Sequence, residues 1–100
     1  MPKLANQATI LLTPTKRSGE DNISLQEQQI GFLHAITDKP GAEFDLIIRD
    51  SAGNIKFEKR GIKNESDRWG ERIDLPVSDN YCKIEVENVR GAEKIDVFAE

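Results

Sequence analysis

Residues 41–61, GAEFDLIIRDSAGNIKFEKRG, contain the pattern that decides the fold class. Apolar and polar side chains alternate on both sides of DSAGN, a turn sequence in which Gly53 supplies a positive φ. A period of two is typical of a strand with one buried face, so the segment predicts a β-hairpin. The alternating apolar positions are Phe44, Leu46 and Ile48 before the turn and Ile55 and Phe57 after it.

The rest of the second half repeats this period. Residues 71–77 (ERIDLPV), 81–89 (YCKIEVENV) and 93–100 (EKIDVFAE) each alternate apolar with polar side chains. Pro76 has no backbone donor and marks a strand end or a sheet edge. With the two strands of the hairpin, the second half accounts for most of a β domain.

The first half is less regular. Strands are predicted from Ala8 to Thr13 and from Ile30 to Thr37, the latter with apolar residues on both faces. Residues 16–22 (KRSGEDN) are polar and rich in turn formers, and residues 24–29 are either strand or an extended lead-in.

Seven or eight short strands without a convincing helix predict an all-β protein. Two packed antiparallel sheets hide the apolar side of every strand, whereas a single sheet leaves one face wet. We therefore expect one β-sandwich domain over residues 7–100, of jelly-roll or immunoglobulin-like kind. Residues 1–6 carry few core signals and are expected to form a flexible arm, which in an assembly becomes an exchanged segment.

The net charge opposes nucleic-acid binding. It is −4 at pH 7, with a pI near 5.0, while phosphate backbones require a cationic face. A local cluster of Lys56, Lys59, Arg60 and Lys63 is expected to be solvated strand charge. The first residues offer no apolar stretch for a signal peptide or membrane helix, which predicts a protein made in the cytoplasm and released, if at all, by a route such as lysis.

Catalytic and metal-binding patterns are weak. His34, the only histidine, stands between apolar neighbours and is expected to be structural, with one satisfied hydrogen bond. Cys82 shares a predicted face with Ile84 and Val86, so it is expected to be a small core residue, and it has no second cysteine for a disulfide. One cysteine and one histidine do not make a zinc site. We expect no enzyme activity and no cofactor.

A calcium site at the hairpin turn is also weighed. Asp50, Ser51 and Asn54, with Asp45 nearby, offer oxygen ligands, but the twelve-residue loop pattern with its closing glutamate is missing. Turn residues that bond their own backbone explain the same sequence, and we expect no metal.

Trp69, the only tryptophan, lies among charges in ESDRWGERIDLP (65–76). It is expected in a loop, either folded back to close one end of the core or exposed as a contact. In the exposed alternative, Trp69 with Arg68 and Glu71 binds carbohydrate.

Phe98 is the second candidate contact. It falls on the polar face of the last strand, with Lys94 and Asp96. Either it touches a partner or neighbouring subunit, or a bulge shifts the register there.

From residue 32 to 99 the order of features resembles the pre-peptidase C-terminal-type β-sandwich family. The matching stretches are AEFDLIIRD, SAGN, RIDLP, NYCKIEVEN and KIDVFAE. The resemblance implies a non-catalytic module, although that family accompanies secreted enzymes. In style, a short acidic sandwich with an N-terminal arm is similar to phage virion accessory or decoration proteins. The main hypothesis is a structural or interaction protein of a virion, which acts on a protein partner or as a homo-oligomer. The alternative is a carbohydrate-binding module. An enzyme is expected only if His34 is exposed beside a carboxylate.

Overall fold

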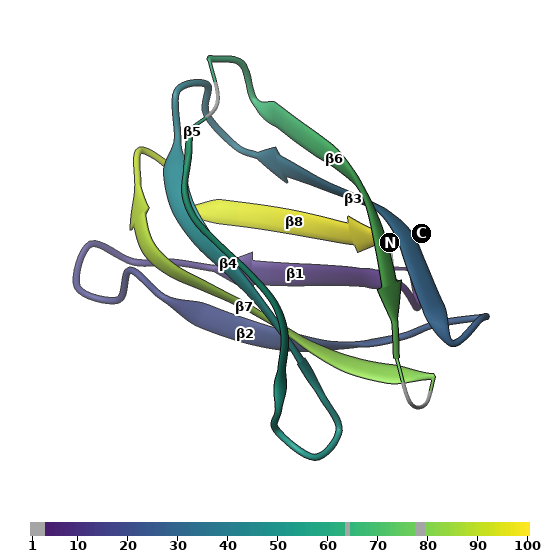
Figure 1. The fold of residues 1–100 in the computed structure, drawn as a ribbon. Coiled ribbons are helices and arrows are strands. Elements are labelled where there is room, and N and C mark those ends of the chain that lie inside the picture. Colours follow the sequence, from purple (N-terminus) through teal and green to yellow (C-terminus); the bar gives the residue numbers. More distant parts are fainter. Residues whose placement is uncertain (1–3, 64, 78–79) are drawn as a thin grey trace.

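The chain folds into two packed antiparallel sheets (Figure 1). The computed structural model describes residues 4–63, 65–77 and 80–100. These residues contain eight strands and no helix, which confirms the predicted all-β sandwich. The strands are β1 (Gln7–Leu11), β2 (Gly19–Ser24), β3 (Gln29–Thr37), β4 (Glu43–Asp50), β5 (Ile55–Lys63), β6 (Arg68–Pro76), β7 (Tyr81–Arg90) and β8 (Lys94–Ala99).

The strand pairs are nested. One sheet has the order β1-β8-β3-β6 and the other has the order β2-β7-β4-β5. β4 and β5 form the predicted hairpin, and the pairs β3–β6, β2–β7 and β1–β8 join segments progressively farther apart in the chain. The two ends of the domain therefore lie side by side, and Ala99 N–H donates to the Asn6 carbonyl at 3.2 Å.

The core lies between the sheets and follows the predicted alternation. In β8, and in β7 as far as Val86, one residue in two is buried, so the expected inward positions are confirmed. The radius of gyration of 12.6 Å is close to the roughly 13 Å expected for a chain of this length. The largest fully buried side chains are Phe44, Ile10, Ile23, Ile30, Leu33, Leu46, Ile47, Ile48, Ile84, Ile95, Val86 and Val89.

Two predictions about the elements were wrong, and one open alternative is decided. The end of the polar stretch predicted as turn, from Gly19 onward, is the start of β2, which pairs with β7 although its own sequence carries little apolar alternation. The chain leaves the sheet after Ser24, so of the two alternatives for residues 24–29 the strand does not hold for residues 25–28, which connect β2 to β3. β6 begins at Arg68, and Trp69 therefore lies within a strand and not in a loop.

β4 is buried on both faces, although its sequence predicts one wet face. Ile47 is buried, and its register partners on the flanking strands are Glu58 and Glu85. Asp45, expected on the polar face, is also buried. A central strand is covered by the long side chains of its neighbours, which no pattern within β4 itself records.

The predicted N-terminal arm is only partly described. Residues 1–3 lie outside the described ranges. The Ala5 carbonyl accepts a hydrogen bond from Ser24 N–H at 2.8 Å, and Asn6 is bonded to Ala99. Ala5 is therefore bonded to β2 in one sheet, and Asn6 is bonded to β8 in the other. A flexible arm over residues 1–6 stays a prediction.

Candidate functional site

The outer face of the β1-β8-β3-β6 sheet carries a group of apolar and aromatic side chains. We call this group the aromatic face; its members are Phe32, His34, Ile36 and Phe98. Phe32 is 37% exposed, and the other three are half-buried; Leu11, which is 69% exposed, lies opposite Lys94 at the far end of β1. No described element packs over this face. An apolar group on an uncovered sheet face is a feature that needs an explanation.

Phe98 belongs to this face by its register. It pairs with His34 on β3 and with Gln7 on β1, while its neighbours Val97 and Ala99 are buried in the core. The predicted orientation of Phe98 is confirmed, and the alternative of a shifted register is wrong.

Three rings form a row across β8 and β3. The ring centroids of His34 and Phe98 are 4.6 Å apart, and those of Phe32 and His34 are 5.9 Å apart. The row continues onto β6 through Gly70, where a Cβ would lie 2.9 Å from Cζ of Phe32. Gly70 therefore leaves the space in which the Phe32 ring rests, and the rings form a continuous surface.

His34 has an unusual polar environment. Its Nε2 atom is buried and has no hydrogen-bond partner, and the nearest carboxylate oxygen, Oε1 of Glu100, is 3.6 Å away. The expected satisfied bond is thus missing at Nε2. Its side chain is 30% exposed beside a carboxylate, but 3.6 Å exceeds hydrogen-bond length, and no nucleophile is bonded to His34 among the described residues.

Charged side chains surround the aromatic face. Arg68 and Arg72 extend from the outward positions of β6 and are exposed. Glu100 is 60% exposed, and Asp96 is half-buried where it accepts a hydrogen bond from Thr9 at 2.7 Å. An apolar centre with a polar rim is the usual composition of a protein interface.

Trp69 points to the opposite side of β6. Its ring is half-buried and packs against the core together with Phe57, Ile73 and Leu75. Nζ of Lys59 lies 6.0 Å from the ring centroid and 2.5 Å from Oε1 of Glu71. Trp69 therefore covers the core where the edge strands β5 and β6 approach, as the closing alternative predicted.

The predicted contact residues consequently do not form one site. Arg68 and Phe98 lie on the outer face, whereas Trp69 and Glu71 lie on the inner side of β6. Alternation along a strand separates neighbours such as Arg68 and Trp69, and this separation became predictable only once residue 68 was known to begin a strand.

The basic cluster on β5 is largely engaged. Lys59 is paired with Glu71, and Arg60 is paired with Asp45 and Glu58. Lys56 and Lys63 are exposed. The expectation of solvated strand charge therefore fits Lys56 and Lys63, whereas Lys59 and Arg60 are held in ion pairs.

In the hairpin turn, the Asp50 carboxylate accepts hydrogen bonds from the backbone of the turn itself. Oδ1 of Asp50 accepts hydrogen bonds from the backbone N–H groups of Ala52 and Asn54, at 3.0 and 2.9 Å. These bonds lower the pKa of Asp50, the one from Asn54 most. Asp45 is bonded elsewhere, and within the described ranges no three His, Cys, Asp or Glu side chains gather to hold a metal.

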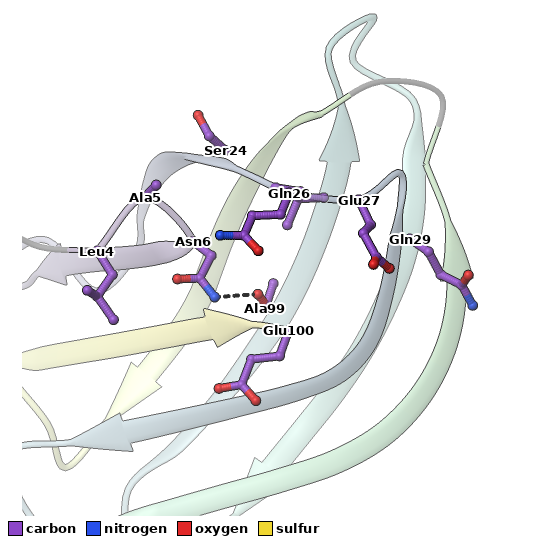
Figure 2. A pocket seen from close by; sticks show the side chains of 10 residues that line it. Leu4, Ala5, Asn6, Ser24, Gln26, Glu27, Gln29, Ala99 and Glu100 are labelled. Carbon is purple, nitrogen blue, oxygen red and sulfur yellow. Dashed lines mark hydrogen bonds between the residues drawn. The ribbon is translucent and has the colours of Figure 1, made fainter.

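A pocket of about 580 Å³ lies at the end of the sandwich beside the aromatic face (Figure 2). We call it the end pocket. Its walls come from the segment before β1, the connection between β2 and β3, and the end of β8. The lining side chains include Leu4, Asn6, Leu25, Gln26, Glu27 and Glu100. Sequence reasoning missed it because segments far apart in the chain supply its walls without any motif.

No protein-family model matches the sequence, and no curated protein matches it. Among solved structures, TmCBM61 in complex with beta-1,4-galactotriose is similar, with a TM-score of 0.40 and 19% identity over 93% of this chain and 66% of that chain. Structures of infectious bursal disease virus, strains Gt and Gx, give TM-scores of 0.35 and 0.32 at 13% and 15% identity. They cover 94% and 96% of this chain, which spans 28% and 26% of theirs. These likenesses concern the sandwich fold alone.

The described residues contain no helix that is long and apolar enough to cross a membrane.

Proposed function

We propose that this chain is a non-catalytic structural or interaction protein that binds another protein, or a second copy of itself, through the aromatic face. The observation that carries the proposal is the row of Phe32, His34 and Phe98 rings on a sheet face that no described element covers. Covering these rings removes apolar area from water, and each aromatic side chain contributes a large share of that area.

The polar groups support a protein partner. The rim presents cationic Arg68 and Arg72 on β6 and anionic Glu100 at the end of β8. Rim charges of both signs give orientation and specificity to a contact whose apolar centre supplies the affinity.

The finer form of the proposal is a phage-type virion accessory or assembly component. The nested order of the eight strands supports the jelly-roll alternative over the immunoglobulin-like one, and jelly rolls occur in viral capsid and lectin domains. A fold hosts many functions, so this setting is tested separately, by searching purified particles for the chain with mass spectrometry.

Carbohydrate binding through Trp69 is less well supported. Its ring is half-buried against the core and lies on the other side of β6 from Arg68, so Trp69 and Arg68 cannot bind one sugar together.

Photo-crosslinking tests the proposed contact. A benzoylphenylalanine replaces Phe32 in one protein and Ile55, an apolar residue that is 48% exposed on β5, in a matched control. In source cells, position 32 is expected to give one dominant protein adduct, including a self-adduct if the partner is a second copy, and position 55 none. Equal adducts from both positions, or none from position 32, contradict the proposal. Light scattering over a concentration series then separates self-association from a different partner.

A further inference from the structure

We infer that the end pocket binds a cationic side chain, arginine or lysine, supplied by the protein partner. This inference names the chemistry of that partner, and it rests on the proposed function. Glu100 connects the two places, because it lines the pocket and its carboxylate faces His34 of the aromatic face. A protein lying across the rings therefore reaches the pocket without leaving the surface.

The pocket is preformed by bonds between distant segments. Asn6 Nδ2 donates to the Ala99 carbonyl at 2.8 Å, as Figure 2 shows, and Ser24 N–H donates to the Ala5 carbonyl at the same distance. On the other side, Nδ2 of Asn80 donates to the Leu25 carbonyl at 2.8 Å. These bonds fix the walls before a ligand arrives, which lowers the entropic cost of binding.

The charge of the pocket selects the ligand. Glu27 and Glu100 line it, and among the described residues of its walls there is no lysine or arginine. Glu27 has no ion pair in the described structure, and the partner of Glu100 is His34, at 3.6 Å. Some carboxylates elsewhere do have a cationic partner, for example Glu71 with Lys59 and Glu85 with Arg49. An anion is therefore repelled, and a cation gains charge-assisted hydrogen bonds.

The remaining lining fits the stem and head of a basic side chain. Leu4 and Leu25 provide apolar walls for a methylene chain, and Leu25 is 8% exposed. The Gln26 amide makes no hydrogen bond among the described residues, so its oxygen is free to accept one. The described lining residues include no aromatic ring, which disfavours a sugar, because sugars in protein sites usually stack on one. Figure 2 shows Gln26, Glu27 and Glu100 arranged around the pocket.

Nuclear magnetic resonance titration of the isotope-labelled protein tests the inference. The probe is N-acetyl-arginine methylamide, and its control is the uncharged citrulline analogue of the same shape. We expect saturable shifts at Asn6 and at residues 25–27, with a Kd on the order of 1–10 mM for so small a probe. The combined variant Glu27→Gln, Glu100→Gln is expected to raise that Kd about tenfold, the loss of one to two charge-assisted bonds.

Glu65→Gln is the matched control, because it removes one exposed charge outside the pocket and should leave the Kd unchanged. Equal binding of the citrulline analogue, shifts away from the pocket, or full binding by the double variant overturns the inference. Shifts at the same residues with galactose and not with arginine assign the pocket to a polyol instead.

The two proposals fail separately. If crosslinking from position 32 succeeds and the arginine probe does not bind, the aromatic face stands and the pocket inference falls. If the probe binds and position 32 gives no adduct, the proposed function falls and the pocket remains a cation site.

Discussion

Oδ2 of Asp45 in β4 accepts a hydrogen bond from Nδ2 of Asn88 in β7 at 2.8 Å, where the register of the two strands shifts. Asn88 is the only non-glycine residue with a positive φ, +53°, in the described chain. On the other side, Oδ1 of Asp45 accepts from the backbone N–H of Gly61, which has a φ of +69°. One carboxylate thus fixes an irregularity in each strand that flanks it.

Replacing Asp45 should expose how much these bonds contribute. Bonds to a buried charged acceptor contribute more than neutral ones, so Asp45→Asn is expected to cost about 2–3 kcal/mol of unfolding free energy. Urea unfolding of the wild type and of Asp45→Asn measures this difference in unfolding free energy. Asp67→Asn, an exposed aspartate whose ion pair with Arg68 spans 3.9 Å, is the control and should cost under about 0.5 kcal/mol. Equal losses in the two variants would show that the Asp45 bonds are not special.

The same carboxylate predicts a pH dependence. The hydrogen bond from Asn88, then that from Gly61 and the Arg60 guanidinium, hold the pKa of Asp45 below its usual value. A carboxyl whose folded pKa is lowered stabilises the protein above its unfolded pKa of about 3.9, and loses that contribution as the pH falls through the folded pKa. Wild-type stability should therefore fall below about pH 4 more steeply than that of Asp45→Asn, and parallel curves would contradict this assignment.

Trp69→Ala should destabilise the protein, since the ring covers core residues between β5 and β6. Because the ring is half-buried, we expect about 2–3 kcal/mol, less than the roughly 3–5 kcal/mol for a fully buried aromatic residue. Lys59→Met removes the charge near the ring and should cost at most about 1 kcal/mol. If Trp69→Ala loses less than about 1 kcal/mol of unfolding free energy, the ring is a surface contact and does not cover the core. Crosslinking from position 32 should be unchanged, because Trp69 is not part of the aromatic face.

Gly70→Ala should move the Phe32 ring without unfolding the sheet. The new methyl would meet Cζ, the far end of the ring, at 2.9 Å, so the ring swings outward and the expected cost is under about 1 kcal/mol. The α-proton resonance of Gly70 should be shifted by the Phe32 ring current in the wild type and lose that shift in Phe32→Leu. An unshifted wild-type resonance would mean that the ring does not rest on Gly70.

Cys82 should be inert in the folded protein. Its side chain is fully buried, so a thiol reagent should modify it only as fast as the protein opens. The reaction should become immediate in denaturant. Rapid modification without denaturant would show that β2, which pairs with β7 at this residue, detaches readily.

The sequence predicted the parts of the fold that a strand's own alternation records. The hairpin around Gly53, the inward face of β7 and the outward position of Phe98 are all read from a period of two. β2 was not predicted because Ile23 is its one buried residue, so its sequence shows no apolar alternation. Its pairing with β7 depends on a distant segment of the chain. Asp45 was predicted on an exposed polar face but is buried, because β4 lies between two flanking strands.

The candidate site was less predictable than the fold. Phe98 was singled out from its place on a polar face, but Phe32 and His34 join it only because β3 pairs with β8. The end pocket combines residues 4–6, 24–29 and 99–100, so its chemistry appears only when the chain ends are brought together. Trp69 attracted attention as the only tryptophan, yet its packing gives it a covering role.

The nested strand order also has a kinetic consequence. Residues 7 and 98 are partners across β1 and β8, and each inner strand pair encloses a shorter loop, down to the β4–β5 hairpin. Bringing such distant strands together costs loop-closure entropy, so we expect folding to nucleate at the hairpin, whose loop is the shortest. We expect overall folding in milliseconds to seconds, as for other chains of high contact order. On that route β1 and β8 join last, and the aromatic face and the end pocket are completed only in the final step.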